Sequence, residues 1–102
     1  MDEFEHVKAP MAKRGATWRG GYQGEEMELF REVDGEREAL IVGYTGKPPH
    51  RRWWVDTWDH RRASRGLGAV LEQVEAEYRK TAAKMLRRAE ELAEIRREVS
   101  GD

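Results

Sequence analysis

The chain has 102 residues, with 19 Lys and Arg side chains against 20 Asp and Glu, and it contains no cysteine. This length sets a limit of one domain. The missing thiol excludes a disulfide scaffold, thiol catalysis and any Cys-ligated zinc or iron–sulfur centre. No apolar run approaches the roughly 20 residues that span a bilayer, and the acidic N-terminus lacks the apolar core of a signal peptide. We therefore expect a cytoplasmic protein with no membrane partner.

The net charge of −1 conceals an uneven distribution along the chain. Residues 1–45 carry six basic and ten acidic side chains, whereas residues 46–66 carry six basic and two acidic ones. Three of the four tryptophans also lie in this middle segment. A near-neutral total charge therefore does not exclude an anionic partner.

The N-terminal segment shows no hydrophobic period. Residues 1–16 contain Pro10, Gly15 and scattered charges, so we predict a flexible tail. A short strand is expected from Thr17 to Gln23, where two adjacent glycines indicate a bulge or an edge.

The dipeptide Asp34-Gly35, between two alternating runs, gives the clearest local pattern in the chain. It predicts a two-residue hairpin, because both turn positions need a positive φ. The turn sets the register, which places two pairs of opposite charge and two apolar pairs directly across from each other. These pairs are Glu32/Arg37, Arg31/Glu38, Leu29/Leu40 and Met27/Val42. We assign the face with the apolar pairs to the core. We expect the acidic face of the first strand to be solvated or to dock a basic partner.

A third main strand is predicted from Arg52 to Trp58, which is rich in aromatic and β-branched residues. Alternation places Trp54, Asp56 and Trp58 on one face and Trp53, Val55 and Thr57 on the other. Neither face is plainly apolar, so this strand alone does not show which side meets the core.

Residues from about 64 to 99 follow a helical pattern, in which apolar side chains recur at intervals of seven. These residues are Leu71, Tyr78, Met85, Leu92 and Val99. They predict an amphipathic helix of some 30 residues, about 45 Å long.

Such a helix is longer than a compact domain of this size, whose diameter is roughly 35 Å. Its second half must bury apolar residues elsewhere, and the same helix of another copy is the simplest partner, through a coiled-coil-like contact. The predicted self-association residues are Tyr78, Met85, Ala89, Leu92 and Val99. Small Ala82 and Ala89 favour a close helix–helix approach. The alternatives are a helix that bends, frays after about Arg88 or folds back as a hairpin.

The segment from His50 to Arg65 joins arginines to tryptophans, a combination that binds phosphates and stacks on bases. The same residue types dominate protein-interface hot spots, and the tryptophans also suit a small core. All three interpretations remain open. The candidate binding residues are Arg51, Arg52, Trp53, Trp58, Arg61, Arg62 and Arg65. The last three lie at or before the predicted helix start, where cations oppose the helix dipole and suggest an external anion.

Catalytic patterns are weak in this chain. Asp56, Asp59, His50 and His60 form the one plausible metal or acid–base cluster, but their spacing matches no ligand motif. The two serines lie outside nucleophile motifs. We therefore expect no enzyme, no metal and no cofactor.

These observations predict an α+β fold: a three- to four-stranded antiparallel sheet over residues 17–58, then one long C-terminal amphipathic helix, in a single domain of residues 17–102. The order of elements over residues 27–78 resembles small DNA-binding modules of the integrase arm-binding kind. We expect a self-associating regulatory protein, with a dimer favoured, that docks on a partner protein, as accessory proteins of phages or mobile elements do. The alternative is a nucleic-acid-binding module that uses residues 50–65.

Overall fold

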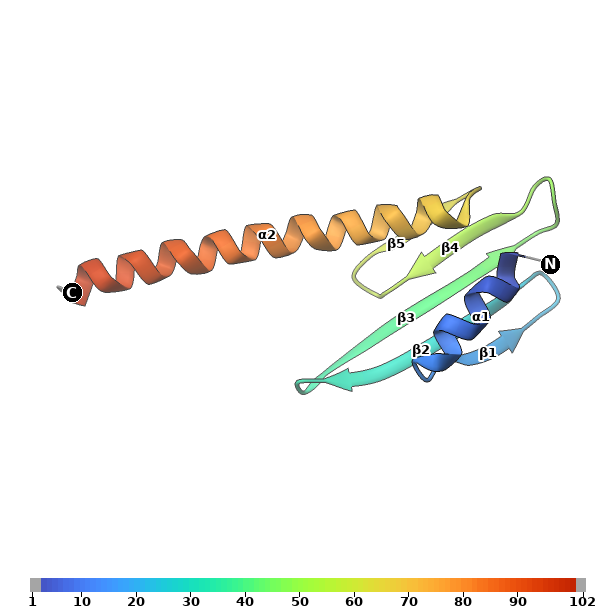
Figure 1. Ribbon diagram of the computed structural model, residues 1–102, viewed down its shortest axis with the longest axis horizontal. Coiled ribbons are helices and arrows are strands. Elements are labelled where there is room, and N and C mark those ends of the chain that lie inside the picture. Colours follow the sequence, from blue (N-terminus) through green and yellow to red (C-terminus); the bar gives the residue numbers. More distant parts are fainter. Residues whose placement is uncertain (1–2, 101–102) are drawn as a thin grey trace.

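The computed structural model describes residues 3–100, which form two helices and one five-stranded sheet (Figure 1). The elements in chain order are α1 (Glu3–Lys13), β1 (Thr17–Gly20), β2 (Glu25–Val33), β3 (Glu36–Thr45), β4 (Arg52–Asp56), β5 (Arg61–Ser64) and α2 (Leu67–Ser100). The strands pair in sequence order, each antiparallel to the next. The α+β class is confirmed, but the sheet has five strands instead of three or four.

The β2–β3 hairpin has the register predicted from its turn. Asp34 and Gly35 adopt φ values of 52° and 82°, and Val33 pairs with Glu36 beside them. Every predicted pair down to Met27 and Val42 is present. Turn chemistry and the alternation of side chains thus agree on one register, because a slip by one residue would turn each apolar side chain to the other face.

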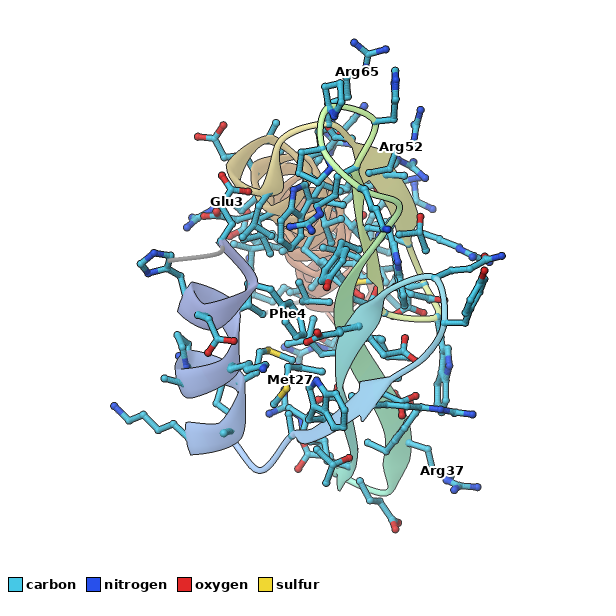
Figure 2. All side chains as sticks on the ribbon, turned by 90° about the vertical axis from the view of Figure 1, so that its right-hand side faces the viewer. Glu3, Phe4, Met27, Arg37, Arg52 and Arg65 are labelled. Atoms are coloured by element: carbon cyan, nitrogen blue, oxygen red, sulfur yellow. The ribbon has the colours of Figure 1, made fainter. Side chains whose placement is uncertain are left out.

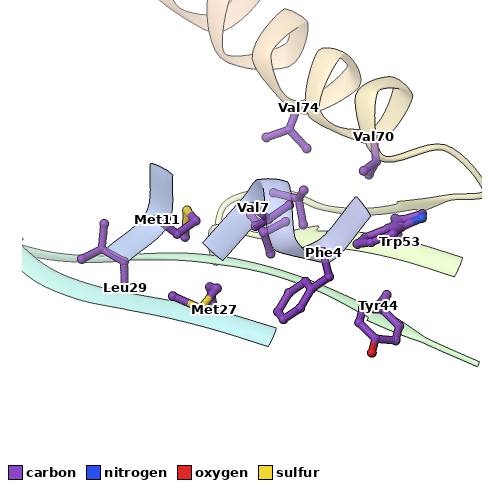
Figure 3. Close-up of a cluster of buried hydrophobic side chains, with 11 residues drawn as sticks. Phe4, Val7, Met11, Met27, Leu29, Tyr44, Trp53, Val70 and Val74 are labelled. Atoms are coloured by element: carbon purple, nitrogen blue, oxygen red, sulfur yellow. The ribbon is translucent and has the colours of Figure 1, made fainter. Parts of the chain in front are cut away.

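One face of the sheet carries the core, as the hairpin predicted. The buried strand residues are Met27, Leu29, Val42, Tyr44, Trp53 and Val55 (Figure 3). The register pairs Val42 with Val55 and Tyr44 with Trp53, so β4 continues the apolar face of the hairpin. Trp53 is only 2% exposed, so the side of β4 that carries Trp53 and Val55 is the one that meets the core.

Helix α1 covers part of this face, so the flexible tail expected over residues 1–16 is wrong for Glu3–Lys13, and residues 1–2 lie outside the described residues. Phe4, Val7 and Met11, spaced by three and four, point into the core (Figure 3). Phe4 is 1% exposed, and its ring meets Tyr44 edge-on at 5.3 Å. Gly15, with φ 97°, ends the helix, and the amide of Ala16 donates to the carbonyl of Met11.

Strand β5 was not expected. Strand β4 ends at Asp56, two residues before the predicted end at Trp58, and a tight turn with a hydrogen bond from Thr57 N to His60 O leads into β5. Arg61 and Arg62 therefore lie in a strand instead of at a helix start. Four polar and small residues carry little β-propensity, so pairing with β4 decides their conformation.

Helix α2 is continuous from Leu67 to Ser100, so the alternative of a helix folded back on itself is wrong. Val70 and Val74 are its buried residues, whereas every residue from Arg79 to Leu92 is exposed. The helix leaves the sheet and gives the molecule a length of 63 Å (Figure 1). Within residues 3–100, neither helix is long and apolar enough to cross a membrane.

We expect Phe4→Ala to lower the free energy of unfolding by about 3–5 kcal/mol, because it leaves a cavity beneath α1. Urea unfolding followed by circular dichroism measures this change. Tyr22→Ala is the control, since this ring is fully exposed and its loss should alter stability by less than about 0.5 kcal/mol. Equal effects of the two substitutions would contradict the packing of α1.

Candidate protein-binding surfaces

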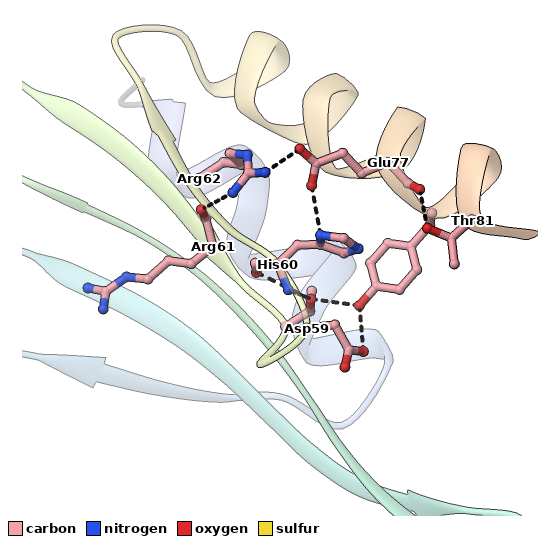
Figure 4. Close-up of polar contacts among 8 residues, drawn as sticks. Asp59, His60, Arg61, Arg62, Glu77 and Thr81 are labelled. Atoms are coloured by element: carbon pink, nitrogen blue, oxygen red, sulfur yellow. Dashed lines mark hydrogen bonds and ion pairs between the residues drawn. The ribbon is translucent and has the colours of Figure 1, made fainter.

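A polar network fastens α2 to the β4–β5 turn (Figure 4). Glu77 of α2 has two basic side chains beside it: His60 Nδ1 lies 2.7 Å from Oε2, and the Arg62 guanidinium pairs with Oε1. Both partners come from the turn and from β5, which places them under the third turn of the helix. The network therefore sets the direction in which α2 leaves the sheet.

Tyr78 adds a second attachment beside Glu77. Its hydroxyl lies 2.6 Å from Thr57 Oγ1 and 3.1 Å from Asp59 Oδ2, and its ring meets His60 edge-on at 4.8 Å. Burial raises the pKa of the Tyr78 hydroxyl; Asp59 raises it further, and the hydrogen bond with Thr57 lowers it. The protonated hydroxyl can therefore donate to the Asp59 carboxylate. Tyr78, predicted for self-association, has a clear role in holding the helix.

Beyond Tyr78, α2 presents large apolar side chains to solvent. Those predicted for self-association are Met85, Leu92 and Val99, with exposed Ala89 between them. Ile95, which the sequence pattern placed beside this row, is also exposed, and so is Leu86, which the pattern missed because it lies about a third of a turn from the row. Together these residues define the protruding helix stripe: Met85, Leu86, Ala89, Leu92, Ile95 and Val99.

A pair of aromatic rings stands on the sheet face that neither helix covers. Phe30 and Trp58 lie 5.9 Å apart between ring centroids, and each is more than half exposed. Trp58 has φ 69°, and its amide donates to Asp56 Oδ1 at 2.9 Å. Ala39, the cross-strand partner of Phe30, is nevertheless 6% exposed on this face. The turn geometry thus sets Trp58 against the hairpin and creates an exposed aromatic pair.

Charges of both signs surround this pair on the same open face. Alternation and register place Arg37, Arg52 and Arg61 there, together with acidic residues. Figure 2 shows Arg37 and Arg52 on the side of the sheet opposite α1. The acidic residues of this face are Glu26, Glu28, Glu32 and Asp56. We call the Phe30–Trp58 pair with these charges the open face.

The acidic side of the open face is partly paired and partly desolvated. Glu28 lies 3.9 Å from the Arg19 guanidinium. Burial raises the pKa of Glu26; the neighbouring Glu28 raises it further, and Arg19 lowers it. Glu26 also lines a hollow of about 210 Å³ with Trp54 and the glycines of the β1–β2 turn. These carboxylates disfavour a polyanion on this half of the face.

The structure separates the predicted binding residues into two groups. Arg51 stacks on the rings of Tyr44 and Trp53, at 4.1 and 5.8 Å from the ring centroids, and Trp53 is buried. Together with Arg62, which pairs with Glu77, these residues stabilise the fold. The exposed group is Arg52, Trp58, Arg61 and Arg65. Phe30 joins them as a residue that sequence reasoning missed, although the predicted register already placed it on the side away from Leu29.

Across residues 3–100, no three His, Asp or Glu side chains gather as ligands of a metal ion would. His60 and Asp59 instead contact α2 through separate partners, Glu77 and Tyr78. Comparison with family models, curated proteins and solved structures gave no match.

We expect Tyr78→Phe to lower the free energy of unfolding by about 0.5–1.5 kcal/mol, because the Thr57 and Asp59 oxygens lose their partner. Urea unfolding checks this value. Tyr22→Phe removes the same hydroxyl from an exposed ring and should leave stability unchanged. A Tyr78 variant as stable as its control would show that this attachment contributes nothing.

Proposed function

We propose that the protein is a non-enzymatic, self-associating binding protein, in which α2 joins two copies and the open face docks a partner protein. The observation that carries the proposal is the protruding helix stripe. Met85, Leu92 and Val99 are each about two-thirds exposed or more. In proteins most of the stability of a helix comes from packing of its apolar side, and a large exposed apolar patch marks an interaction surface.

A second copy suits this stripe better than an unrelated partner does. The stripe belongs to every copy, so two helices bury it mutually without any further molecule. Three of its residues, Met85, Leu92 and Val99, recur at intervals of seven, which is typical of helices that pack along their length. Ala82 and Ala89 are small and exposed, which permits a close approach of two helix axes.

The open face supports the second part of the proposal. An exposed tryptophan beside arginines is a common composition of interface hot spots. Phe30 and Trp58 already contact each other, so their side chains lose little freedom on binding. The surrounding charges of both signs favour a protein surface of mixed charge as the partner.

Nucleic-acid binding is the alternative function. It is favoured by the position of Arg52 and Arg61 on the same face as Trp54, where guanidinium groups and a ring could follow a single strand. It is opposed by Glu26, Glu28 and Asp56 on that face. We therefore place it second.

We expect the protein to sediment as a dimer at micromolar concentration and Leu92→Glu to weaken association at least about 100-fold. Each copy would lose the burial of a leucine, worth ~1.5–3 kcal/mol. Sedimentation equilibrium over a range of concentrations measures the constant. Ala83→Glu adds the same charge on the opposite side of α2, half a turn from the Val74–Leu92 line, and should leave it unchanged. A monomeric wild-type mass would overturn the self-association.

We expect Trp58→Ala to weaken binding of the protein partner at least about tenfold, as loss of a hot-spot residue does. A partner captured on the immobilised chain is purified, and its affinity is measured by calorimetry for the wild type, Trp58→Ala and the control Tyr22→Ala. Equal affinities for all three would contradict docking on the open face.

The alternative is tested in parallel with a labelled single-stranded oligonucleotide. Binding at low salt that falls steeply with added salt and with Arg52→Gln would support the nucleic-acid module instead.

A further inference from the structure

We propose that the two copies pair through the C-terminal halves of α2 in antiparallel orientation, crossing near Ala89, with their sheets at opposite ends of the dimer. This inference rests on the self-association proposed above and adds its geometry. Two features of the structure carry it: the side of α2 on which the apolar residues lie, and the order of charge along the helix.

The apolar side of the protruding half is the same side that meets the sheet. Val74 is buried against the core. Met85 and Leu92 follow it by eleven and eighteen residues, which are close to three and five helical turns. The three side chains therefore line up on one side of α2. A partner helix on this side lies in the space that continues beyond the end of the sheet (Figure 1).

This placement excludes a parallel pair on steric grounds. In a parallel two-fold dimer both helices would face the axis with the side that carries Val70 and Val74, and both sheets would occupy the same space. In an antiparallel dimer the partner's sheet lies past Ser100, and its helix ends near Tyr78. The helix of each copy then covers the apolar side of the other helix beyond the sheet, and the two sheets do not overlap.

The charge order along α2 points to the same orientation. The half-segment from Arg79 to Arg88 carries five basic side chains and no acidic one. The half-segment from Glu90 to Glu98 carries four acidic and two basic side chains. A parallel pair sets the strongly basic segments beside each other. An antiparallel pair about Ala89 sets each basic segment beside an acidic one, within the screening length of ~8 Å at physiological salt.

Residues near the crossing fit a close contact. With Ala89 at the centre, Met85 and Leu92 of each helix lie on the contact side within about 6 Å of the crossing along the helix axis, and Met85 lies at the level of Ala93 of the other helix. The large apolar side chains of the contact side thus flank the crossing, and Ala89 leaves room for them. The sheets of such a dimer lie about 50 Å apart along the helix axis. Its two open faces therefore engage a partner at two separated points.

Nitroxide labels on single cysteines test the orientation, because the natural chain has no cysteine to compete. Glu98→Cys lies far from the proposed crossing, and Glu90→Cys lies beside it as the matched control. Pulsed electron spin resonance should give about 30 Å between labels at position 98 and about 10–20 Å at position 90. Sedimentation of each labelled variant establishes that it remains a dimer.

The possible results separate the two proposals. Short distances at both positions in a dimer would overturn the antiparallel orientation and leave self-association standing. Long distances at both positions in a dimer would show pairing away from Ala89 and overturn this inference as well. A monomer would overturn the proposed self-association itself, and the orientation with it.

Discussion

Two helices share one face of the sheet, and this division of space governs the rest of the molecule. Helix α1 packs Phe4, Val7 and Met11 onto β1, β2 and β3. The remaining area over β4 and β5 accepts the first turns of α2, through Val70 and Val74. The core is therefore complete while most of a 34-residue helix is still outside it.

The attachment of α2 is polar where its apolar contact with the sheet ends. Glu77 meets His60 and Arg62, and Tyr78 meets Thr57 and Asp59, all at the β4–β5 turn. Contacts of this kind are directional, so they set an angle as well as a distance. The turn thereby aims α2 away from the sheet, and the same turn sets Trp58 on the open face. One local structure thus connects both candidate binding surfaces.

The hairpin was predicted and α1 was not, because local contacts determine the hairpin and distant contacts determine α1. Asp34-Gly35 restricts the backbone locally, so a few residues determine the register of eight pairs. Helix α1 is 11 residues long and contains Pro10, which gives it little stability of its own. It forms because Phe4 finds a buried place beside Tyr44, a residue 40 positions away. Strand β5 depends in the same way on β4.

The candidate binding segment was visible in the sequence as a cluster of arginines and tryptophans. The sequence did not show which of them stabilise the fold and which are exposed. Alternation places Trp53 and Trp54 on opposite faces without showing which face is covered. Arg51 and Arg62 become structural through Tyr44 and Glu77, partners that lie far along the chain. Phe30 gains its importance from Trp58, with which it shares no local pattern.

The amino-acid sequence by itself determined the class of fold, the hairpin register and a helix too long for its domain, because turn chemistry and periodicity act over a few residues. The tertiary structure alone decided where the helix leaves the sheet, which arginines are exposed and which aromatic rings meet on the open face. Those outcomes depend on competition for one limited apolar surface between segments at the two ends of the chain. Burial of that kind is a property of the assembled sheet and helices, and no local segment encodes it.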